Sequence, residues 1–150
     1  MKYILIVEDS KITAKALKDL ITKYIKDLIP IIKTTEAEAT EFINKYYKDI
    51  FVALLDLNLP DTVIQGHIVD IALAKKIKSI ILTGNTNDKV RKKFLIRLDI
   101  VDYVVKDSLK NIEYVVGLLN WIYQNSKSDQ KTLLVEDSKV QRHMIKGTLD

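Results

Sequence analysis

Among its 150 residues the sequence has no cysteine, which excludes disulfides, thiolate metal sites and cysteine nucleophiles. It has only four glycines, and no glycine-rich turn follows the first apolar run, which disfavours dinucleotide binding. No apolar run approaches the roughly 18 residues that span a bilayer, and the first run leads directly into Glu8 and Asp9. The sequence therefore predicts neither a membrane span nor a signal peptide, and we expect a cytoplasmic protein without membrane contact.

The composition is that of a chain with one folded core. Apolar residues make up 47% and charged residues 29%, so enough surface can be buried to offset the conformational entropy of folding. The net charge is +4, but the lysines are spread over most segments of the sequence. Because a nucleic-acid footprint needs positive charge concentrated on one face, nucleic-acid binding is not expected.

Five short apolar runs predict five strands, at residues 3–7, 31–32, 51–55, 79–82 and 101–105. Except for the second, they show little alternation, as expected for parallel strands covered on both faces. Segments with helical spacing lie between them, and the clearest apolar stripe is formed by Leu17, Leu20, Ile21, Tyr24, Ile25 and Leu28. The alternation predicts an α/β fold with a doubly wound five-stranded parallel sheet, which binds ligands at the carboxyl ends of its strands.

Capping residues mark three helix starts. Ser10 is suited to cap the first helix, and Thr35 with Glu38 forms a capping-box pattern for the second. Asp107 or Ser108 opens the last helix, which is predicted to span about residues 109–124.

A repeat near the end of the sequence defines the expected domain organisation. The segment Leu133–Lys139 matches Leu5–Lys11, with five consecutive identities from valine to lysine. We therefore expect a first domain at residues 1–124, a polar linker at 125–131, and the truncated start of a second copy of the domain at 132–150.

Three acidic residues follow two of the predicted strands. Glu8 and Asp9 come directly after the first strand, and Asp56 follows the third. Neighbouring parallel strands lie about 4.8 Å apart, so these carboxylates are expected to share one site. Two such charges 4 Å apart repel by about 4 kcal/mol at an effective dielectric near 20, which a bound cation relieves. Oxygen ligands without histidine or cysteine favour Mg²⁺.

Two more polar side chains end the next strands. Thr83 closes the fourth strand and Lys106 the fifth. A hydroxyl and an ammonium group are the donors that a phosphoryl group needs, because its transfer depends on positioning and on neutralising charge. Any one of these residues alone would be a helix cap or a surface side chain, but their joint occurrence at successive strand ends favours a phosphoryl site.

With these landmarks in this order, residues 1 to about 125 resemble a response-regulator receiver domain of the CheY-like superfamily, with its flavodoxin-like (βα)5 fold. The resemblance implies that Asp56 is the phosphoacceptor and that Thr83 and Lys106 contact the phosphoryl oxygens. It also implies that Asp9 and Asp56 bind Mg²⁺, that Glu8 acts through water, and that the backbone carbonyl of Asn58 completes the protein ligands. The segment Leu57–Asp61, followed by Gly66, matches the family's loop after the acceptor.

The aromatic Tyr103 occupies the family's switch position, which implies inward and outward rotamers coupled to Thr83. The alternative is an ordinary packed aromatic side chain with its hydroxyl at the surface. One departure from the family is Asp107, which stands where the family usually has a proline, often after a cis bond. Whether the Lys106–Asp107 bond is cis or trans is left open, and the position of Lys106 depends on it.

Three functions compete. The first is a receiver that takes a phosphoryl group from a sensor histidine kinase or phosphotransfer protein and has only intrinsic self-phosphorylation and dephosphorylation activity. The second is an aspartate phosphatase, which is disfavoured because Asn58 stands where its general acid would be. The third is a pseudo-receiver that serves only as an interaction or dimerisation module.

By analogy, tandem receivers precede a diguanylate cyclase output domain in certain signalling proteins.

A basic segment is a second feature that bears on partners. Its cations are Lys89, Arg91, Lys92, Lys93 and Arg97. They form either a solvated surface or a contact with an acidic partner or a second copy of the chain.

Overall fold

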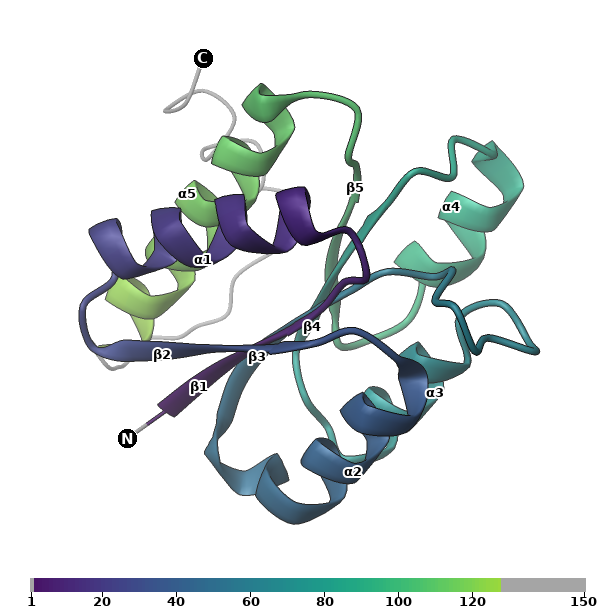
Figure 1. Cartoon of the computed structure of the whole chain (residues 1–150), viewed down its shortest axis with the longest axis horizontal. Helices are drawn as coiled ribbons and strands as arrows, with labels where there is room; N and C mark the ends of the chain where they lie inside the picture. Colours follow the sequence, from purple (N-terminus) through teal and green to yellow (C-terminus); the bar gives the residue numbers. More distant parts are fainter. Residues whose placement is uncertain (1, 128–150) are drawn as a thin grey trace.

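The computed structural model describes residues 2–127, which form a five-stranded parallel sheet between two layers of helices (Figure 1). The strands are β1 (Lys2–Val7), β2 (Leu28–Lys33), β3 (Ile50–Leu55), β4 (Ser79–Thr83) and β5 (Ile100–Val105). The helices are α1 (Lys11–Tyr24), α2 (Glu36–Tyr46), α3 (His67–Ala74), α4 (Asp88–Leu95) and α5 (Leu109–Lys127), with a short 3-10 helix, η1 (Tyr47–Asp49), before β3. The strand order is β2-β1-β3-β4-β5, which confirms the predicted doubly wound sheet. No helix in residues 2–127 is long and apolar enough to cross a membrane.

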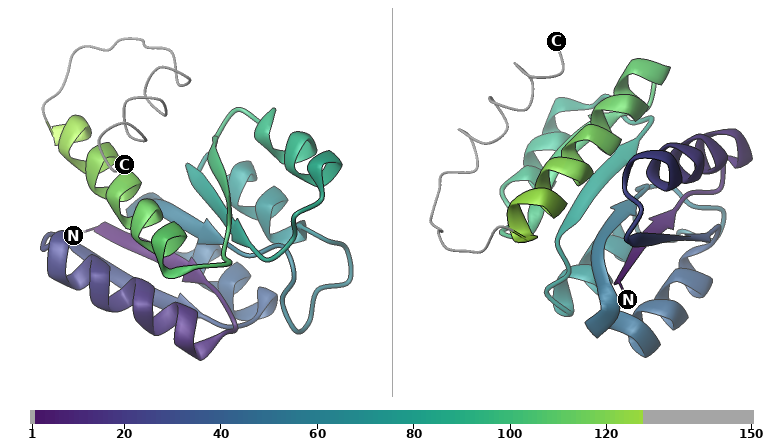
Figure 2. Two further views of the ribbon diagram at one scale, coloured as in Figure 1. Left: turned by 90° about the horizontal axis from the view of Figure 1, so that it is seen from above. Right: turned by 90° about the vertical axis from the view of Figure 1, so that its left-hand side faces the viewer.

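Both faces of the sheet are buried, as the continuous apolar runs predict. Ile4 and Ile6 of β1 pack in one core cluster with α1 and α5, whereas Leu5 and Val7 pack in a second cluster with α2, α3 and α4. The two further views show the same arrangement, with α1 and α5 side by side on one face (Figure 2). Alternate side chains of a single strand therefore support both layers.

The predicted cap residues bond to helix amides, but the predicted capping box closes one residue early, because the Glu38 carboxylate accepts from the Thr34 amide at 3.4 Å. The Ser10 hydroxyl accepts a hydrogen bond from the Thr13 amide at 3.3 Å, and the Thr35 hydroxyl accepts one from the Glu38 amide at 3.1 Å. At the start of α5 the cap is Ser108, whose hydroxyl accepts from the Asn111 amide at 3.3 Å. These bonds hold each helix start directly after a strand end.

The predicted stripe of α1 extends too far. The helix ends at Tyr24, and Ile25 and Leu28 lie outside it, because the Ile25 amide closes the last turn on the Ile21 carbonyl and Leu28 begins β2. Both side chains remain buried in the same cluster as α1, so apolar spacing did not reveal the end of the helix. Strand β2 is longer than residues 31–32 and includes Pro30, which an edge strand tolerates.

The last helix runs three residues beyond its predicted end, to Lys127. The remainder of the predicted linker and the repeated segment 132–150 lie outside the described residues.

Candidate functional site

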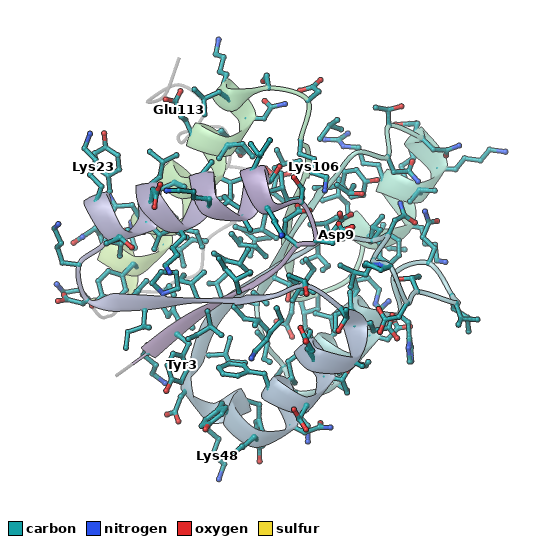
Figure 3. All side chains as sticks on the ribbon, viewed as in Figure 1. Tyr3, Asp9, Lys23, Lys48, Lys106 and Glu113 are labelled. Atoms are coloured by element: carbon teal, nitrogen blue, oxygen red, sulfur yellow. The ribbon has the colours of Figure 1, made fainter. Side chains whose placement is uncertain are left out.

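The carboxyl ends of β1, β3 and β5 bring three predicted site residues into direct contact. Val7 is paired with Leu55 in the sheet, and the Asp56 amide donates to the Val7 carbonyl at 3.2 Å, so Asp56 and Glu8 leave adjacent strand ends. Lys106 follows β5, and its amide donates to the Thr83 carbonyl at 2.9 Å. Figure 3 shows Asp9 and Lys106 at this same edge.

The Lys106 ammonium group joins the two buried carboxylates. Its Nζ atom lies 2.6 Å from Asp56 Oδ2 and 2.8 and 2.9 Å from the two oxygens of Glu8. Glu8 is 2% exposed and Asp56 4% exposed, so both charges are largely withdrawn from water. A buried carboxylate needs such a charged donor, because an unpaired one would be strongly destabilised.

The electrostatics of Glu8 and Lys106 follow from this pairing. Burial raises the pKa of the Glu8 carboxyl group, although hydrogen bonds from Lys106 and from the Ser10 amide oppose the shift. Burial alone would lower the pKa of Lys106, but its hydrogen bonds to Asp56 and Glu8 outweigh burial and raise it. Lys106 is therefore held as a cation beside the Asp56 carboxylate.

The donor set fits a hard divalent cation. One carboxylate oxygen each from Glu8, Asp9 and Asp56 lies within 4.8 Å of the other two. Asp9 is exposed at the mouth of the site, whereas the other two acids are buried. The Asn58 amide donates to Asp56 Oδ1 at 3.2 Å, which fixes the loop that carries the predicted carbonyl ligand. Oxygen ligands of this kind suit Mg²⁺ or Mn²⁺.

Thr83 and Tyr103 meet at the loop between β4 and α4 and are joined there by Asn85. The Thr83 hydroxyl accepts from the Asn85 amide at 3.4 Å, and the Tyr103 hydroxyl donates to the Asn85 carbonyl at 2.9 Å. Tyr103 is 4% exposed, so its ring points inward, and burial raises the pKa of its phenol. Asn85 was not among the predicted residues, although its position two residues after Thr83 is a turn signal.

Asp107 is accommodated without a cis bond. Within residues 2–127 no peptide bond is cis, so the Lys106–Asp107 bond is trans, and Lys106 still reaches both carboxylates. Asn111, which sequence reasoning missed, holds this loop. Its side-chain amide donates to the Val105 carbonyl and to Asp107 Oδ1, both at 2.6 Å. The two bonds tie the residues on either side of Lys106 to the first turn of α5.

The loop after Asp56 contacts both α2 and α4. Asp61 accepts hydrogen bonds from the Glu36 and Ala37 amides at 2.8 and 3.0 Å, and these bonds lower its pKa. Gly66 has φ 77°, and a Cβ atom there would lie 2.4 Å from the Phe94 ring of α4. The loop therefore connects Asp56 to the start of α2 and to α4.

Solved structures similar to this chain identify its family. Two are described as two-component system response regulator/GGDEF domain proteins, and each is 32% identical to this chain. The first has a TM-score of 0.72 and covers 83% of this chain and 49% of its own, and the second has 0.74, 99% and 57%. The chain thus spans about half the length of these relatives. It belongs to the receiver-domain family of response regulators.

The Mn²⁺-bound form of response regulator Rcp1 shares the fold, with a TM-score of 0.66, 24% identity, and coverage of 90% of this chain and 100% of that one. No protein-family profile matches the sequence, and no curated protein matches it.

Proposed function

We propose that this chain is a phosphoaccepting receiver in which Asp56 takes a phosphoryl group from a sensor histidine kinase or phosphotransfer protein. The observation that carries the proposal is the triad of Glu8, Asp56 and Lys106, in which one ammonium group contacts both carboxylates. A carboxylate next to a fixed cation and a second acid is suited to the transfer of a charged group.

In the proposed reaction an Asp56 oxygen forms a bond to phosphorus as the bond from phosphorus to the donor histidine nitrogen breaks. The electron pair of that bond stays on the imidazole. Lys106 neutralises charge on the phosphoryl oxygens, and Thr83 is the hydroxyl donor at the adjacent strand end. Glu8, Asp9, Asp56 and the Asn58 carbonyl would hold Mg²⁺, which when bound supplies further neutralisation of negative charge.

The switch is proposed to act through the bond network around Asn85. A phosphoryl group adds about two negative charges and three acceptor oxygens, which attract the Thr83 hydroxyl away from the Asn85 amide. The Asn85 carbonyl also accepts a hydrogen bond from the Tyr103 hydroxyl. A shift of Asn85 therefore alters the β4–α4 loop and the position of α4. The face formed by α4, β5 and α5 would change shape and expose a different surface to a partner.

The partners remain proposals. The two relatives that are described as GGDEF domain proteins favour a carboxyl-terminal diguanylate cyclase output domain. The sequence repeat favours a second receiver between the first receiver and that output domain. A homodimer contact through the basic segment of α4 also stays a prediction. Such a protein would act in the cytoplasm.

The decisive experiment is phosphorylation with a small-molecule phosphodonor and Mg²⁺, followed by intact-mass measurement and by peptide mapping. We expect one phosphoryl group on wild type and none on Asp56→Asn. The matched control is Asp61→Asn, which alters a carboxylate five residues away that caps α2 and lies outside the pocket. It should label like wild type.

Each alternative function has its own outcome. Rapid turnover of phosphate esters without a stable adduct would indicate a phosphatase. Absence of labelling in wild type would indicate a pseudo-receiver, although the contact of Lys106 with Asp56 argues against that reading. Labelling that persists in Asp56→Asn would disprove the assignment of the acceptor.

A further inference from the structure

We propose that the end of the sheet where the strands begin is a docking surface for an acidic polypeptide segment. It lies opposite the pocket formed by Glu8, Asp9 and Asp56. Six exposed lysines define this lysine face, and they come from the start of β1, the end of α2, η1 and the turn between α3 and β4. They are Lys2, Lys45, Lys48, Lys75, Lys76 and Lys78. Lysines that are dispersed in the sequence are thus gathered in space. Asp56 and Lys106 belong to the other edge, and Figure 3 shows Lys48 far from Asp9 and Lys106.

Contacts between the segments show that three of these lysines, Lys2, Lys48 and Lys75, are neighbours. The Lys2 ammonium group donates to the Lys48 carbonyl at 3.0 Å. The Lys48 and Lys75 ammonium groups lie 5.9 and 4.5 Å from the centroid of the same ring, that of Tyr47. Two segments that are far apart in the sequence therefore place cations over one tyrosine ring, and a third, the start of β1, contacts one of them through the Lys48 carbonyl.

The lysine face is strongly charged and not internally neutralised. In the part of the chain that the structure describes, none of its six lysines forms an ion pair with a carboxylate. Asp49 is the one acid in the same segments, so their formal charge is +5. Because the whole chain carries +4, all remaining residues together sum to −1. The lysine face therefore matches the basic segment at residues 89–97, which also sums to +5, and it carries enough positive charge to attract an anionic partner.

The backbone of Lys76 is a second, independent observation. It has φ 59° and is the only residue other than glycine with positive φ in residues 2–127. The Lys76 and Ile77 amides donate to the Leu73 and Ala72 carbonyls, which is the helix-ending motif that usually places glycine at this position. A lysine there costs roughly 1–2 kcal/mol relative to glycine. A lysine at a position that favours glycine adds charge to the face at a cost in stability, which supports a functional role for that charge.

An acidic polypeptide fits the lysine face better than nucleic acid. The cations are all lysines, whereas bidentate recognition of phosphate and bases favours arginine. The aromatic rings of the face are also engaged. Tyr47 is approached by two lysines, and Tyr46 packs on Tyr3 and Phe42 with Lys45 over its ring. No tyrosine of the face is therefore an open platform for base stacking.

A membrane surface fits less well too. The exposed large apolar side chains of the described residues are Ile12, Tyr24, Val63, Ile64, Ile96, Leu98 and Leu109, and none belongs to the lysine face. A membrane-bound surface normally adds apolar anchors to its cations. Carboxylate side chains on a flexible partner need only separate point charges, which lysines supply.

The test measures binding of the full chain to a fluorescent polyglutamate peptide by anisotropy over a series of salt concentrations. The face variant is Lys45→Glu/Lys48→Glu/Lys75→Glu. The control is Lys18→Glu/Lys23→Glu/Lys110→Glu, which changes three exposed lysines of α1 and α5 and gives the same net charge. We expect wild type and control to bind alike, with affinity falling as salt rises, and the face variant to bind at least about tenfold more weakly.

Two further variants keep the result interpretable. Lys76→Gly should raise stability, because glycine accepts positive φ, and still weaken peptide binding, which separates loss of charge from misfolding. Asp56→Asn should leave binding unchanged, because the lysine face is remote from the pocket. Equal losses in the face and control variants would overturn the proposal. So would the lack of polyglutamate binding at low salt, or tighter face-dependent binding of oligothymidylate or of phosphatidylserine vesicles.

Discussion

Helices α1 and α4 are held to the same sheet in different ways. Helix α1 buries Ala14, Leu17 and Ile21 and packs against α5 and β2. Helix α4 buries a single side chain, Phe94, and its basic residues face solvent. The difference separates a rigid part of the domain from a part that can move, because local stability follows the amount of buried apolar contact.

Helix α1 meets the site at its cap residue Ser10, whose amide donates to Glu8 Oε2 at 3.0 Å, but it is held chiefly by its buried apolar face. Helix α4 has little buried face of its own, so its attachment depends more on the loops that leave the site. Phe94 rests against Gly66 at the end of the loop that follows Asp56, and the start of α4 is reached through Asn85, which bonds to Thr83 and Tyr103. Two paths, one through Gly66 and one through Asn85, thus lead from the sheet edge that carries Asp56 to a weakly held helix. A change at Asp56 is therefore expected to be expressed at α4 first.

The strongest test of this comparison pairs one truncation in each helix. Leu17→Ala should lower the free energy of unfolding by about 2–5 kcal/mol and accelerate hydrogen exchange throughout the domain. Phe94→Ala should lower the free energy of global unfolding less than Leu17→Ala does. It should accelerate hydrogen exchange of the α4 amides well beyond that of the β1 and β3 amides. Urea unfolding and exchange mass spectrometry measure the two effects. If the α4 amides of wild type exchange only through global unfolding, the comparison fails.

A smaller effect is expected at the glycine against which Phe94 rests. Gly66→Ala places a side chain at φ 77° and 2.4 Å from the Phe94 ring, so the ring must move. We expect a loss on the order of 1–3 kcal/mol and faster exchange in α4. Gly84→Ala is the matched control, because a Cβ atom there meets nothing within 4 Å. Similar losses in both variants would mean that α4 is not held through this contact.

The positions of the acids, Thr83 and Lys106 were predictable because a parallel sheet places all strand ends of one kind at one edge. Apolar runs located those ends to within a residue or two, and residue type supplied the chemistry. The fold likewise gathers the lysine face from separate segments at one end of the sheet. Most of its members come from turns and helix ends, which apolar patterns do not define. Scattered lysines therefore suggested a solvated surface.

Loop-dependent features could not be predicted. Asn111 reaches Val105 and Asp107 only because the β5–α5 loop takes one particular path, and a side-chain amide at that spacing carries no distinctive signal. The inward orientation of Tyr103 likewise depends on where the Asn85 carbonyl lies. Sequence patterns identify which elements meet, whereas the hydrogen bonds of irregular backbone require coordinates.

The smallest expected effect concerns the path from Tyr103 through Asn85 to α4. It is visible in the pH dependence of stability. Burial raises the pKa of Tyr103 above its ordinary value of 10.0, against the opposing charge of Arg91, so the folded state favours the neutral phenol. This contribution to stability is fully present below pH 10.0 and is lost as pH rises through the folded pKa. Tyr103→Phe removes the bond to the Asn85 carbonyl and should cost about 0.5–1.5 kcal/mol at neutral pH.

Above pH 10.0 the advantage of wild type over Tyr103→Phe should shrink, because only wild type must bury a tyrosinate or release the ring. Lysine titration is common to both proteins and cancels in the difference. Urea unfolding of the pair on either side of this pH gives the measurement, with α4 exchange at neutral pH as the local readout. A constant difference across that range would show that the ring is already accessible to water, and the path from Tyr103 through Asn85 to α4 would then lose its support.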